Sequence, residues 1–254
     1  MSFSRGLLAA LGLVISACGT LLSLDPEEPA AVPAAADAGA DADAVASPAG
    51  DGGTETGACG ARFCCTFDEP KPCAWSGEDG KPDDVTFAID GTHAASPPNA
   101  LHATTSGAVD EATRTLFVSL GPPPPKATIS LRLALEAFSG GTSSSVHPIE
   151  IVCGDDVAIA VKLKKSGALV LGGGSAEDVI ATSGFPLGVF FEVTLALAWN
   201  GPIVEARLAS DVPGSVPVLY PQPCSGDVSV HVGGAVAGGS GAYALSFDDV
   251  RIDW

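Results

Sequence analysis

The sequence predicts an all-β domain in which antiparallel strands form a sandwich or a barrel. From residue 59 onward, apolar residues recur at every second position, which is the period of a strand with one buried face. The alternating segments are short, and turns rich in Gly, Pro and Asn separate them. No window longer than about ten residues combines a helical period with capping residues. Short strands of this kind bury their apolar faces by packing sheet on sheet or by closing into a barrel.

The expected strands follow one another through the whole of residues 59–254. In 129–136, apolar side chains occupy one face and mainly polar side chains occupy the other. Residues 165–167 (Lys-Ser-Gly) and 200–202 (Asn-Gly-Pro) are typical of tight turns, so each is expected to join two strands into a hairpin. The expected strands are 85–89, 116–120, 129–136, 157–164, 168–171, 191–199, 203–208, 228–232 and 243–254.

The last strand, 243–254, contains a predicted irregularity. Its apolar residues stand at odd positions up to Phe247 and at even positions from Val250. A change of parity requires one extra residue, so we predict a β-bulge at Asp248 and Asp249. A bulge turns side chains to new directions, and here it would aim two adjacent carboxylates at a cation or a turn.

Residues 1–17 are typical of a bacterial signal peptide, with one positive charge followed by an apolar stretch too short to span a bilayer. The stretch ends in Ile15-Ser16-Ala17-Cys18, which resembles the lipobox of bacterial lipoproteins. The resemblance implies cleavage before Cys18 and a lipid anchor on that cysteine. Gly19 stands where an aspartate would retain such a protein at the inner membrane, so the resemblance implies the outer membrane of a Gram-negative bacterium. An ordinary signal peptide followed by a chance cysteine is the alternative.

Residues 18–58 are predicted to be a disordered tether. The segment has no aromatic residue, is rich in Ala, Asp, Gly and Pro, and is interrupted by Pro26, Pro29, Pro33 and Pro48. It holds eight acidic residues and no Lys or Arg, so repulsion between like charges extends it. A flexible chain of about 40 residues spans roughly 35 Å. The segment therefore suits a stalk between a membrane and the β-domain.

The chain has a formal net charge of −18, from 30 acidic and 12 basic residues. Such a surface repels phosphate backbones, so no nucleic acid is expected as a partner. The charge is compatible with cations, neutral sugars or protein partners. Solubility alone explains it more simply.

The seven cysteines divide into Cys18 and an even set of six. The six are Cys59, Cys64, Cys65, Cys73, Cys153 and Cys224. An even set in an exported chain indicates disulfides, and we expect two local bridges within 59–73 and a long bridge from Cys153 to Cys224. Zinc is the alternative for the first four, although their spacing lacks the paired C-x2-C clamps of zinc ribbons.

Both ends of the domain resemble jelly-roll proteins. Residues 243–252, Tyr-x-Leu-x-Phe-Asp-Asp-Val-Arg-Ile, are similar to the closing strand of the concanavalin A-like and laminin-G-like group and of several carbohydrate-binding modules. Residues 66–69, followed by Trp75, resemble their first strand, and 96–101 resemble the loop and strand that commonly come next. The resemblance covers about residues 64–254 and implies an antiparallel jelly-roll β-sandwich. This fold hosts lectins, enzymes and spacers alike.

The same resemblance implies a structural calcium ion. In related carbohydrate-binding modules this ion joins an acidic residue of the first strand to an aspartate of the last. The matching positions here are Asp68, Glu69, Asp248 and Asp249, and their carboxylate oxygens suit calcium. The alternative is that these side chains hold turns, cap backbone N–H groups or pair with Arg251.

No catalytic motif stands out from the sequence. Glucanases that resemble this fold place two carboxylates on one strand face, but the nearest segment has Glu150 followed by Val152 where the second acid is needed. Glu192 stands alone, and Ser240 lacks a nucleophile-elbow motif. The four histidines, His93, His102, His147 and His231, are scattered, so each is expected to be an ordinary strand or surface residue.

Aromatic platforms for sugar binding are few. Trp75 and Trp199 fall on predicted core faces, which leaves Tyr220, in a proline-flanked segment, as the best candidate for an exposed ring. Packing within its own loop explains Tyr220 better than a stacking role. The count of aromatic residues thus permits a lectin but offers little support for one.

We therefore expect a non-enzymatic, lipid-anchored β-sandwich module of the cell envelope that binds a glycan or a protein. A structural envelope protein without a small ligand is the second hypothesis. A divergent enzyme related to glycoside hydrolases is the third.

Overall fold

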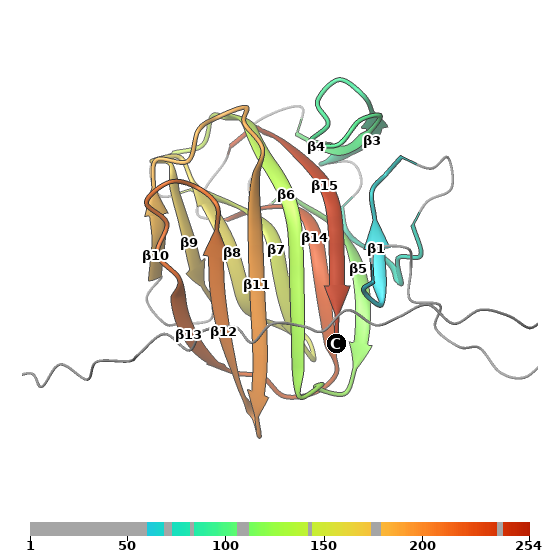
Figure 1. Ribbon diagram of the computed structural model, residues 1–254, viewed down its shortest axis with the longest axis vertical. Helices are drawn as coiled ribbons and strands as arrows, with labels where there is room; N and C mark the ends of the chain where they lie inside the picture. The colour runs from blue at the N-terminus through green and yellow to red at the C-terminus, as the bar shows by residue number, and fades with distance from the viewer. Residues whose placement is uncertain are drawn as a thin grey trace, which may run out of the picture. The chain divides into compact units, whose positions relative to one another are not determined.

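Two antiparallel sheets account for the strands of the protein (Figure 1). The computed structural model describes residues 60–68, 73–81, 84–105, 112–141, 144–173, 179–237 and 241–254. The predicted signal peptide and tether, together with Cys18, Cys59 and Glu69, lie outside the described residues. Within the described ranges, no helix is long and apolar enough to cross a membrane.

Sheet A contains β1 (Phe63–Cys65), β3 (Thr86–Asp90), β4 (Ala100–Thr104), β6 (Lys126–Phe138), β11 (Phe191–Asn200), β12 (Ile203–Ser210), β13 (Val218–Pro223) and β15 (Tyr243–Asp253). Its order is β13-β12-β11-β6-β15-β4-β3, and β1 also pairs with β15. The hairpin predicted around 200–202 is confirmed, because β11 and β12 pair without interruption up to Asn200 and Ile203.

Sheet B contains β2 (Gly77–Gly80), β5 (Thr113–Gly121), β7 (Ser145–Cys153), β8 (Asp156–Lys164), β9 (Ala168–Gly172), β10 (Val179–Ser183) and β14 (Val228–Ala237). Its order is β10-β9-β8-β7-β14-β5-β2, so β7 and β14 lie at its centre. Figure 1 shows sheet B behind β6, β11, β12 and β15 of sheet A. The hairpin predicted around 165–167 is confirmed as β8 and β9.

The core lies between the two sheets. Ile129, Leu131 and Leu133 of β6 are almost fully buried, and Ile149 and Ile151 of β7 belong to the same apolar cluster. Burial of each such side chain contributes about 1.5–3 kcal/mol. This packing fixes which face of each strand points inward. The all-β sandwich predicted from the period of two is confirmed, and it leaves each sheet with an outer face.

The predicted bulge in the last strand is confirmed. The pairing of β15 with β6 shifts register between Asp248 and Arg251, and Asp249 has a positive φ of 52°. One extra residue in β15 therefore reverses the side-chain alternation where the apolar parity changes. The strand keeps its apolar side chains in the core on both sides of the bulge, with Phe247 and Val250 both fully buried.

The strand prediction needs correction at its first strand and at β2, β7, β10 and β13, none of which was expected. The first strand is β1, and the predicted segment 66–69 begins where β1 ends, because Phe67 has a φ of 60° that leaves the extended conformation. Strand β7 was not expected, because nearly all of its residues are buried and the polar–apolar alternation is broken near Pro148. A strand that is buried along nearly its whole length shows no clear period of two.

Two disulfides are present among the described residues, one from Cys65 to Cys73 and one from Cys153 to Cys224. Both agree with the predicted pattern of local bridges and one long bridge. Cys64 is also disulfide-bonded. Because a zinc site needs thiolates and these sulfur atoms are oxidised, the zinc alternative is wrong.

Candidate functional site

A proline in the middle of β7 shapes the outer face of sheet B. Pro148 has no N–H to donate to a neighbouring strand, so its place in a central strand requires a bulge. Along β7 the pairing with β8 passes from Val146 to Ile149, while along β8 it passes only from Leu163 to Val161. Two residues of β7 therefore oppose one residue of β8, which reverses the side-chain alternation of β7 at this point.

The bulge brings His147 and Glu150 onto the same face. Residues three apart on a regular strand point to opposite faces, and the extra residue removes that separation. Strand β14 accommodates the irregularity with Gly233 and Gly234, which interrupt its own pairing with β7. A Cβ on Gly233 would collide with the carbonyl oxygen of Arg114, so glycine is required there.

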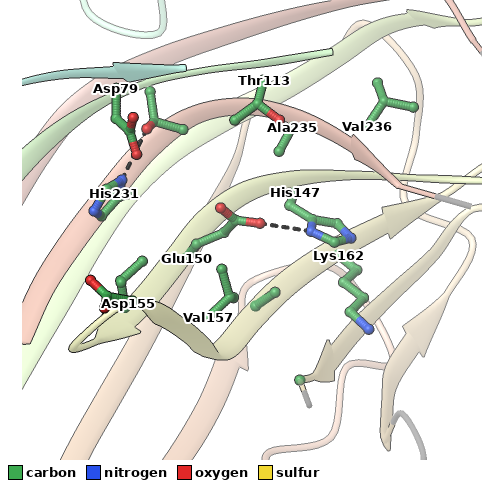
Figure 2. Close-up of a pocket in the computed structure, with 14 residues that line it drawn as sticks. Asp79, Thr113, His147, Glu150, Asp155, Val157, Lys162, His231, Ala235 and Val236 are labelled. Carbon is green, nitrogen blue, oxygen red and sulfur yellow. Dashed lines mark hydrogen bonds and ion pairs between the residues drawn. The ribbon is translucent and has the colours of Figure 1, made fainter. Parts of the chain in front are cut away.

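A cavity of about 530 Å³ opens on this outer face (Figure 2). Its charged and titratable lining consists of Asp79 of β2, His147 and Glu150 of β7, Asp155 of the β7–β8 turn, Lys162 of β8 and His231 of β14. Small residues, among them Ala160, Gly173 and Ala235, line the space between these side chains. The volume falls in the range of about 300–1,000 Å³ that small-ligand sites occupy.

Three side chains of β7 form one hydrogen-bonded chain beside the cavity. Ser145 Oγ lies 3.0 Å from His147 Nε2. His147 Nδ1 lies 2.9 Å from Glu150 Oε1, and this second contact is drawn in Figure 2. All three residues are more than nine-tenths buried. The second carboxylate oxygen of Glu150, Oε2, has no hydrogen-bond partner within the described part of the chain. Glu150 can therefore orient His147 with one oxygen and reach a ligand with the other.

The neighbouring strand β14 supplies a second chain of similar geometry. Ser229 Oγ lies 2.9 Å from His231 Nε2, and Thr115 Oγ1 lies 3.0 Å from His231 Nδ1. Burial lowers the pKa of His231, and the charges of Asp79 and Glu150 oppose this shift only in part. His231 is therefore neutral at neutral pH.

These side chains belong to a row that crosses sheet B. Cross-strand pairing places Phe117 opposite His231, His231 opposite Glu150, and Glu150 opposite Ala160. The Phe117 ring stacks on His231 with ring centroids 5.2 Å apart. The row thus passes from an aromatic ring to polar groups and then to a small residue on one continuous face.

The lining of the cavity is net negative. Three carboxylates, those of Asp79, Glu150 and Asp155, oppose the single ammonium of Lys162 when both histidines are neutral. The chain as a whole has the same sign, with a net charge of −18. This field favours neutral or cationic ligands over anionic ones.

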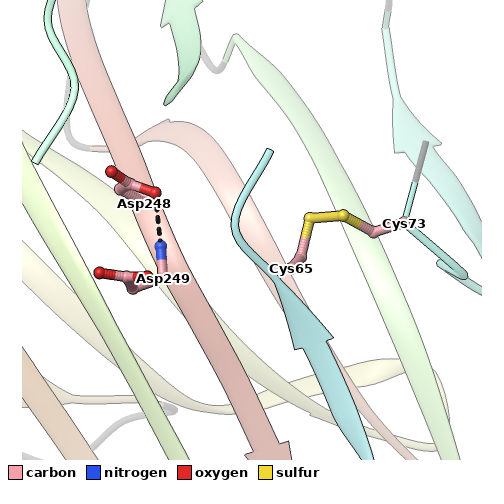
Figure 3. The surroundings of a disulfide bond; sticks show 4 residues. All are labelled: Cys65, Cys73, Asp248 and Asp249. Atoms are coloured by element: carbon pink, nitrogen blue, oxygen red, sulfur yellow. Dashed lines mark hydrogen bonds between the residues drawn. A yellow bond between two sulfur atoms is a disulfide. The ribbon is translucent and has the colours of Figure 1, made fainter. Parts of the chain in front are cut away.

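The carboxylates of the bulge in β15 lie on the other sheet. Asp248 is fully buried and accepts hydrogen bonds from the N–H and the Oγ–H of Ser96 at 2.7 and 3.0 Å. It also accepts the N–H of Asp249 at 2.8 Å (Figure 3). Desolvation raises the pKa of Asp248. Asp249 itself lines a small hollow of about 70 Å³ together with Glu192 and Arg251.

The first-strand carboxylates of the predicted calcium site are placed only in part. Asp68 Oδ1 accepts the N–H of Asn99 at 3.1 Å, and Glu69 lies outside the described residues. Among the residues that the structure does describe, no group of three or more His, Cys, Asp or Glu side chains is arranged to hold a metal ion. The hydrogen bonds of Asp68 and Asp248 match the alternative of capped N–H groups. The calcium site stays a prediction, which melting in calcium against melting in a chelator tests.

A second pair of histidines lies over sheet A. His102 Nε2 is 3.1 Å from Asp90 Oδ1, and His102 Nδ1 is 2.8 Å from Ser246 Oγ. His93 Nδ1 is 3.5 Å from Glu136 Oε2, and the same carboxylate accepts a hydrogen bond from Ser246. Ser246 is fully buried, and the cluster joins β3, β4, β6 and β15.

The grouping of the histidines was not predicted from the sequence. They are scattered in the chain, but the fold gathers His147 and His231 in one cavity and brings His93 and His102 to 6.4 Å between ring centroids. A signal for the cavity was present in Pro148, because a proline between apolar strand residues indicates a bulge. The bulge predicts that the polar residues on either side of it share a face.

The packing interpretation of three aromatic side chains is confirmed, although Tyr220 lies in a strand and not in a loop. Trp75 and Trp199 pack against the core as expected. Tyr220 is buried in β13, and its hydroxyl donates a hydrogen bond to the carbonyl oxygen of Gly173 at 2.7 Å, so it is not the exposed ring. Packing, which was the favoured interpretation of Tyr220, describes its role. The half-buried Phe117 lies nearer the cavity, stacked on His231.

No protein-family model and no curated protein matches this chain in sequence. Among solved structures, the cellulose induced protein Cip1 is 16% identical with a TM-score of 0.47, over 70% of this chain and 87% of Cip1. An alginate lyase from Klebsiella pneumoniae is 13% identical with a TM-score of 0.41, over 66% and 80% of the two chains. The galectin LEC-6 of Caenorhabditis elegans is 16% identical with a TM-score of 0.36, over 57% and 95%. These neighbours are jelly-roll β-sandwich proteins, and the similarity concerns the fold alone.

Proposed function

We propose that the domain binds a glycan in the cavity on the outer face of sheet B. The observation on which the proposal depends is the cavity itself, about 530 Å³ in volume and lined by carboxylates, histidines and small residues. Concave sites with a few converging polar groups on a rigid scaffold are the usual form of ligand sites. Because β7 and β14 lie at the centre of sheet B, the polar groups are held on the most rigid part of that sheet.

The chemistry of the lining suits sugar hydroxyl groups. Carboxylate oxygens accept hydrogen bonds from hydroxyls, and Glu150 presents its Oε2 atom for this purpose. Asp79 and Asp155 are exposed in the same cavity and add acceptors at its edge. Val152, Val157 and Ala160 line the same cavity and offer an apolar surface next to these acceptors. Alternating acceptors and apolar surface match the alternating hydroxyl and C–H groups of a sugar ring.

The charge of the cavity narrows the class of glycan. With three carboxylates against one lysine, a sugar acid would meet repulsion, whereas a neutral or amine-bearing sugar would not. We therefore expect binding of neutral or amine-bearing oligosaccharides and not of polyuronates. Raising the salt concentration should weaken the binding of amine-bearing ligands, because screening reduces their attraction to the carboxylates.

A glycan array followed by calorimetric titration tests this function. The chain from Cys18 onward should bind neutral or amine-bearing oligosaccharides, and Asp79→Asn should weaken that binding about tenfold, equivalent to about 1.4 kcal/mol. The matched control is Asp253→Asn, which removes an exposed carboxylate from β15 of sheet A and should leave binding unchanged. Binding that is indifferent to Asp79→Asn would place the ligand elsewhere, and no binding on the array would remove the proposal.

We further propose that Cys18 anchors the domain to the envelope through lipid, with residues 18–58 as a stalk. The apolar stretch that ends in Ile15-Ser16-Ala17-Cys18 supports this. Expression in a Gram-negative host with a labelled fatty acid should label the wild type and place it in the outer-membrane fraction. Cys18→Ser should abolish both results, whereas an unlabelled wild type would contradict the anchor.

A further inference from the structure

We propose that Ser145 is a nucleophile activated by His147 and Glu150, and that these three residues, which adjoin the cavity through His147 and Glu150, catalyse acyl transfer from esters. The proposal depends on the hydrogen-bonded chain within β7 and is independent of which glycan, if any, the cavity binds. It adds an activity that the sequence did not predict, because the three residues share a face only through the bulge at Pro148.

The nitrogen atoms of His147 are bonded in the order that activation requires. Glu150 Oε1 accepts a hydrogen bond from Nδ1 at 2.9 Å, which keeps the proton on Nδ1 and leaves the lone pair on Nε2. Ser145 Oγ lies 3.0 Å from Nε2, so its proton points at the basic nitrogen. A hydroxyl, an imidazole and a carboxylate bonded in this sequence form the arrangement that raises the nucleophilicity of serine.

Burial strengthens the interactions of this chain. Ser145, His147 and Glu150 are 6%, 9% and 8% exposed, so little water competes for their hydrogen bonds. When His147 takes the serine proton, the imidazolium forms next to the carboxylate of Glu150. At low dielectric that attraction stabilises the ion pair more than water would.

The second chain in the cavity serves as an internal comparison. His231 also has a serine at Nε2, but its Nδ1 faces the hydroxyl of Thr115 instead of a carboxylate. Burial lowers the pKa of His231, so this histidine resists the protonation that general-base catalysis requires. Of the two serines, Ser145 is therefore the one expected to react.

Two lysines of β8 neighbour the proposed nucleophile in the strand pairing. In the pairing of β7 with β8, Ser145 is directly opposite Lys164, and Lys162 is the next residue of β8 on the same face. Directly opposite residues have Cβ atoms about 4.5–5.5 Å apart, within reach of a lysine side chain. An ammonium group that reaches the carbonyl oxygen of a bound ester stabilises the negative oxygen of the tetrahedral intermediate.

The acyl transfer requires only Ser145, His147 and water, and no cofactor. Ser145 Oγ attacks the ester carbonyl carbon while its proton passes to His147 Nε2. The carbon–oxygen bond to the alcohol breaks, and the departing alkoxide takes the proton back from His147. Water then attacks the acyl-serine while His147 accepts its proton. The bond from the acyl carbon to Ser145 Oγ breaks, His147 returns the proton to Oγ, and the carboxylic acid leaves.

A fluorophosphonate probe tests the nucleophile directly. The folded wild type should form a covalent adduct that peptide mass spectrometry locates at Ser145 and not at Ser229, whereas the urea-unfolded chain should form none. Ser145→Ala should abolish labelling, and Glu150→Gln should slow it by at least about tenfold. The control Ser183→Ala, which removes an exposed hydroxyl from β10, should label at the wild-type rate.

Circular dichroism of each variant shows that it is folded, and the wild-type adduct is informative even if Glu150→Gln does not fold. No adduct on the folded wild type, an adduct at Ser229, or a folded Glu150→Gln variant that labels at the wild-type rate would each overturn the inference. Labelling of Ser145 without any glycan binding would support this inference and remove the proposed function. Glycan binding without labelling would do the opposite.

Discussion

Carboxylate side chains play different roles on the two sheets of the sandwich. On sheet A, Asp248 and Asp68 accept hydrogen bonds from the backbone N–H groups of the loop that precedes β4. On sheet B, Asp79 and Asp155 are exposed at the cavity, and Glu150 bonds through one oxygen only. A carboxylate whose lone pairs are filled by backbone donors stabilises the fold. A carboxylate that faces a cavity with an open lone pair is available to a ligand.

The disulfide between Cys153 and Cys224 should affect both faces at once, and its removal is the largest change that we expect. It joins the end of β7 to the segment that connects sheet A with sheet B, across a sequence separation of 71 residues. Loss of a cross-link of that length costs about 4 kcal/mol in the chain-entropy account. Urea unfolding of the double variant Cys153→Ala/Cys224→Ala should show this loss.

The shorter bridge from Cys65 to Cys73 provides the comparison. Its sequence separation is 8 residues, for which the same account gives about 2.5 kcal/mol. The variant Cys65→Ala/Cys73→Ala should therefore be the more stable of the two. An equal or greater loss from the short bridge would show that the bridges act through native contacts rather than through the unfolded chain.

Asp248→Ala should lower the stability of the protein through contacts on sheet A alone. The substitution removes the acceptor of the Ser96 N–H and Oγ–H and of the Asp249 N–H, and these donors lie at a fully buried side chain. Leaving them without partners should cost about 3 kcal/mol of unfolding free energy, measured in urea. Ligand binding and probe labelling on sheet B should stay at wild-type levels.

Asp253→Ala is the control for that substitution. Asp253 is exposed in the same strand, so its loss should change the unfolding free energy by no more than about 0.5 kcal/mol. If Asp248→Ala were as mild as Asp253→Ala, the carboxylate of Asp248 would not be what holds the loop to β15.

His231 should make the stability of the sheet B face depend on pH. Its pKa in the folded protein is lowered by burial below the value of about 6.5 expected when unfolded. Between these two pKa values the unfolded chain binds more protons, so the stabilisation is complete above about pH 6.5 and is lost as the pH falls toward the folded pKa. The melting temperature should fall less between about pH 7.5 and pH 5 in His231→Gln than in the wild type. An identical fall in both proteins would contradict the assignment.

The sequence predicted more of the fold than of the site, for a physical reason. Strands with one wet face, such as β11 and β12, show the period of two, and the bulge at Asp248 and Asp249 shows itself as a change of parity. Nearly all residues of strand β7 are buried, so its pattern does not alternate clearly and it was missed. The residues that line the cavity come mainly from this strand and its neighbours.

The candidate site also depends on long-range pairing, which one strand alone does not reveal. His231 and Glu150 are 81 positions apart in the sequence and become direct cross-strand partners only when β14 pairs with β7. Phe117 and His231 are joined in the same way through β5. What was visible locally was Pro148, whose place among strand residues implies that His147 and Glu150 share a face.

Asp155→Asn should have the smallest effect on stability. It should therefore distinguish most clearly the role of sheet B in ligand binding from the role of sheet A in stability. Asp155 is exposed in the β7–β8 turn and has no side-chain partner in the ranges that the structure describes, so its unfolding free energy should change by no more than about 0.5 kcal/mol. Its carboxylate nevertheless lines the cavity, and losing that acceptor and its charge should weaken ligand binding severalfold, most strongly for amine-bearing ligands. Titration of Asp155→Asn beside Asp248→Ala should then show one variant stable but weak in binding, and the other unstable but binding normally. If Asp155→Asn bound its ligand like the wild type, the edge of the cavity at the β7–β8 turn would not contact the ligand. The acidic contacts of the ligand would then be limited to Asp79 and Glu150.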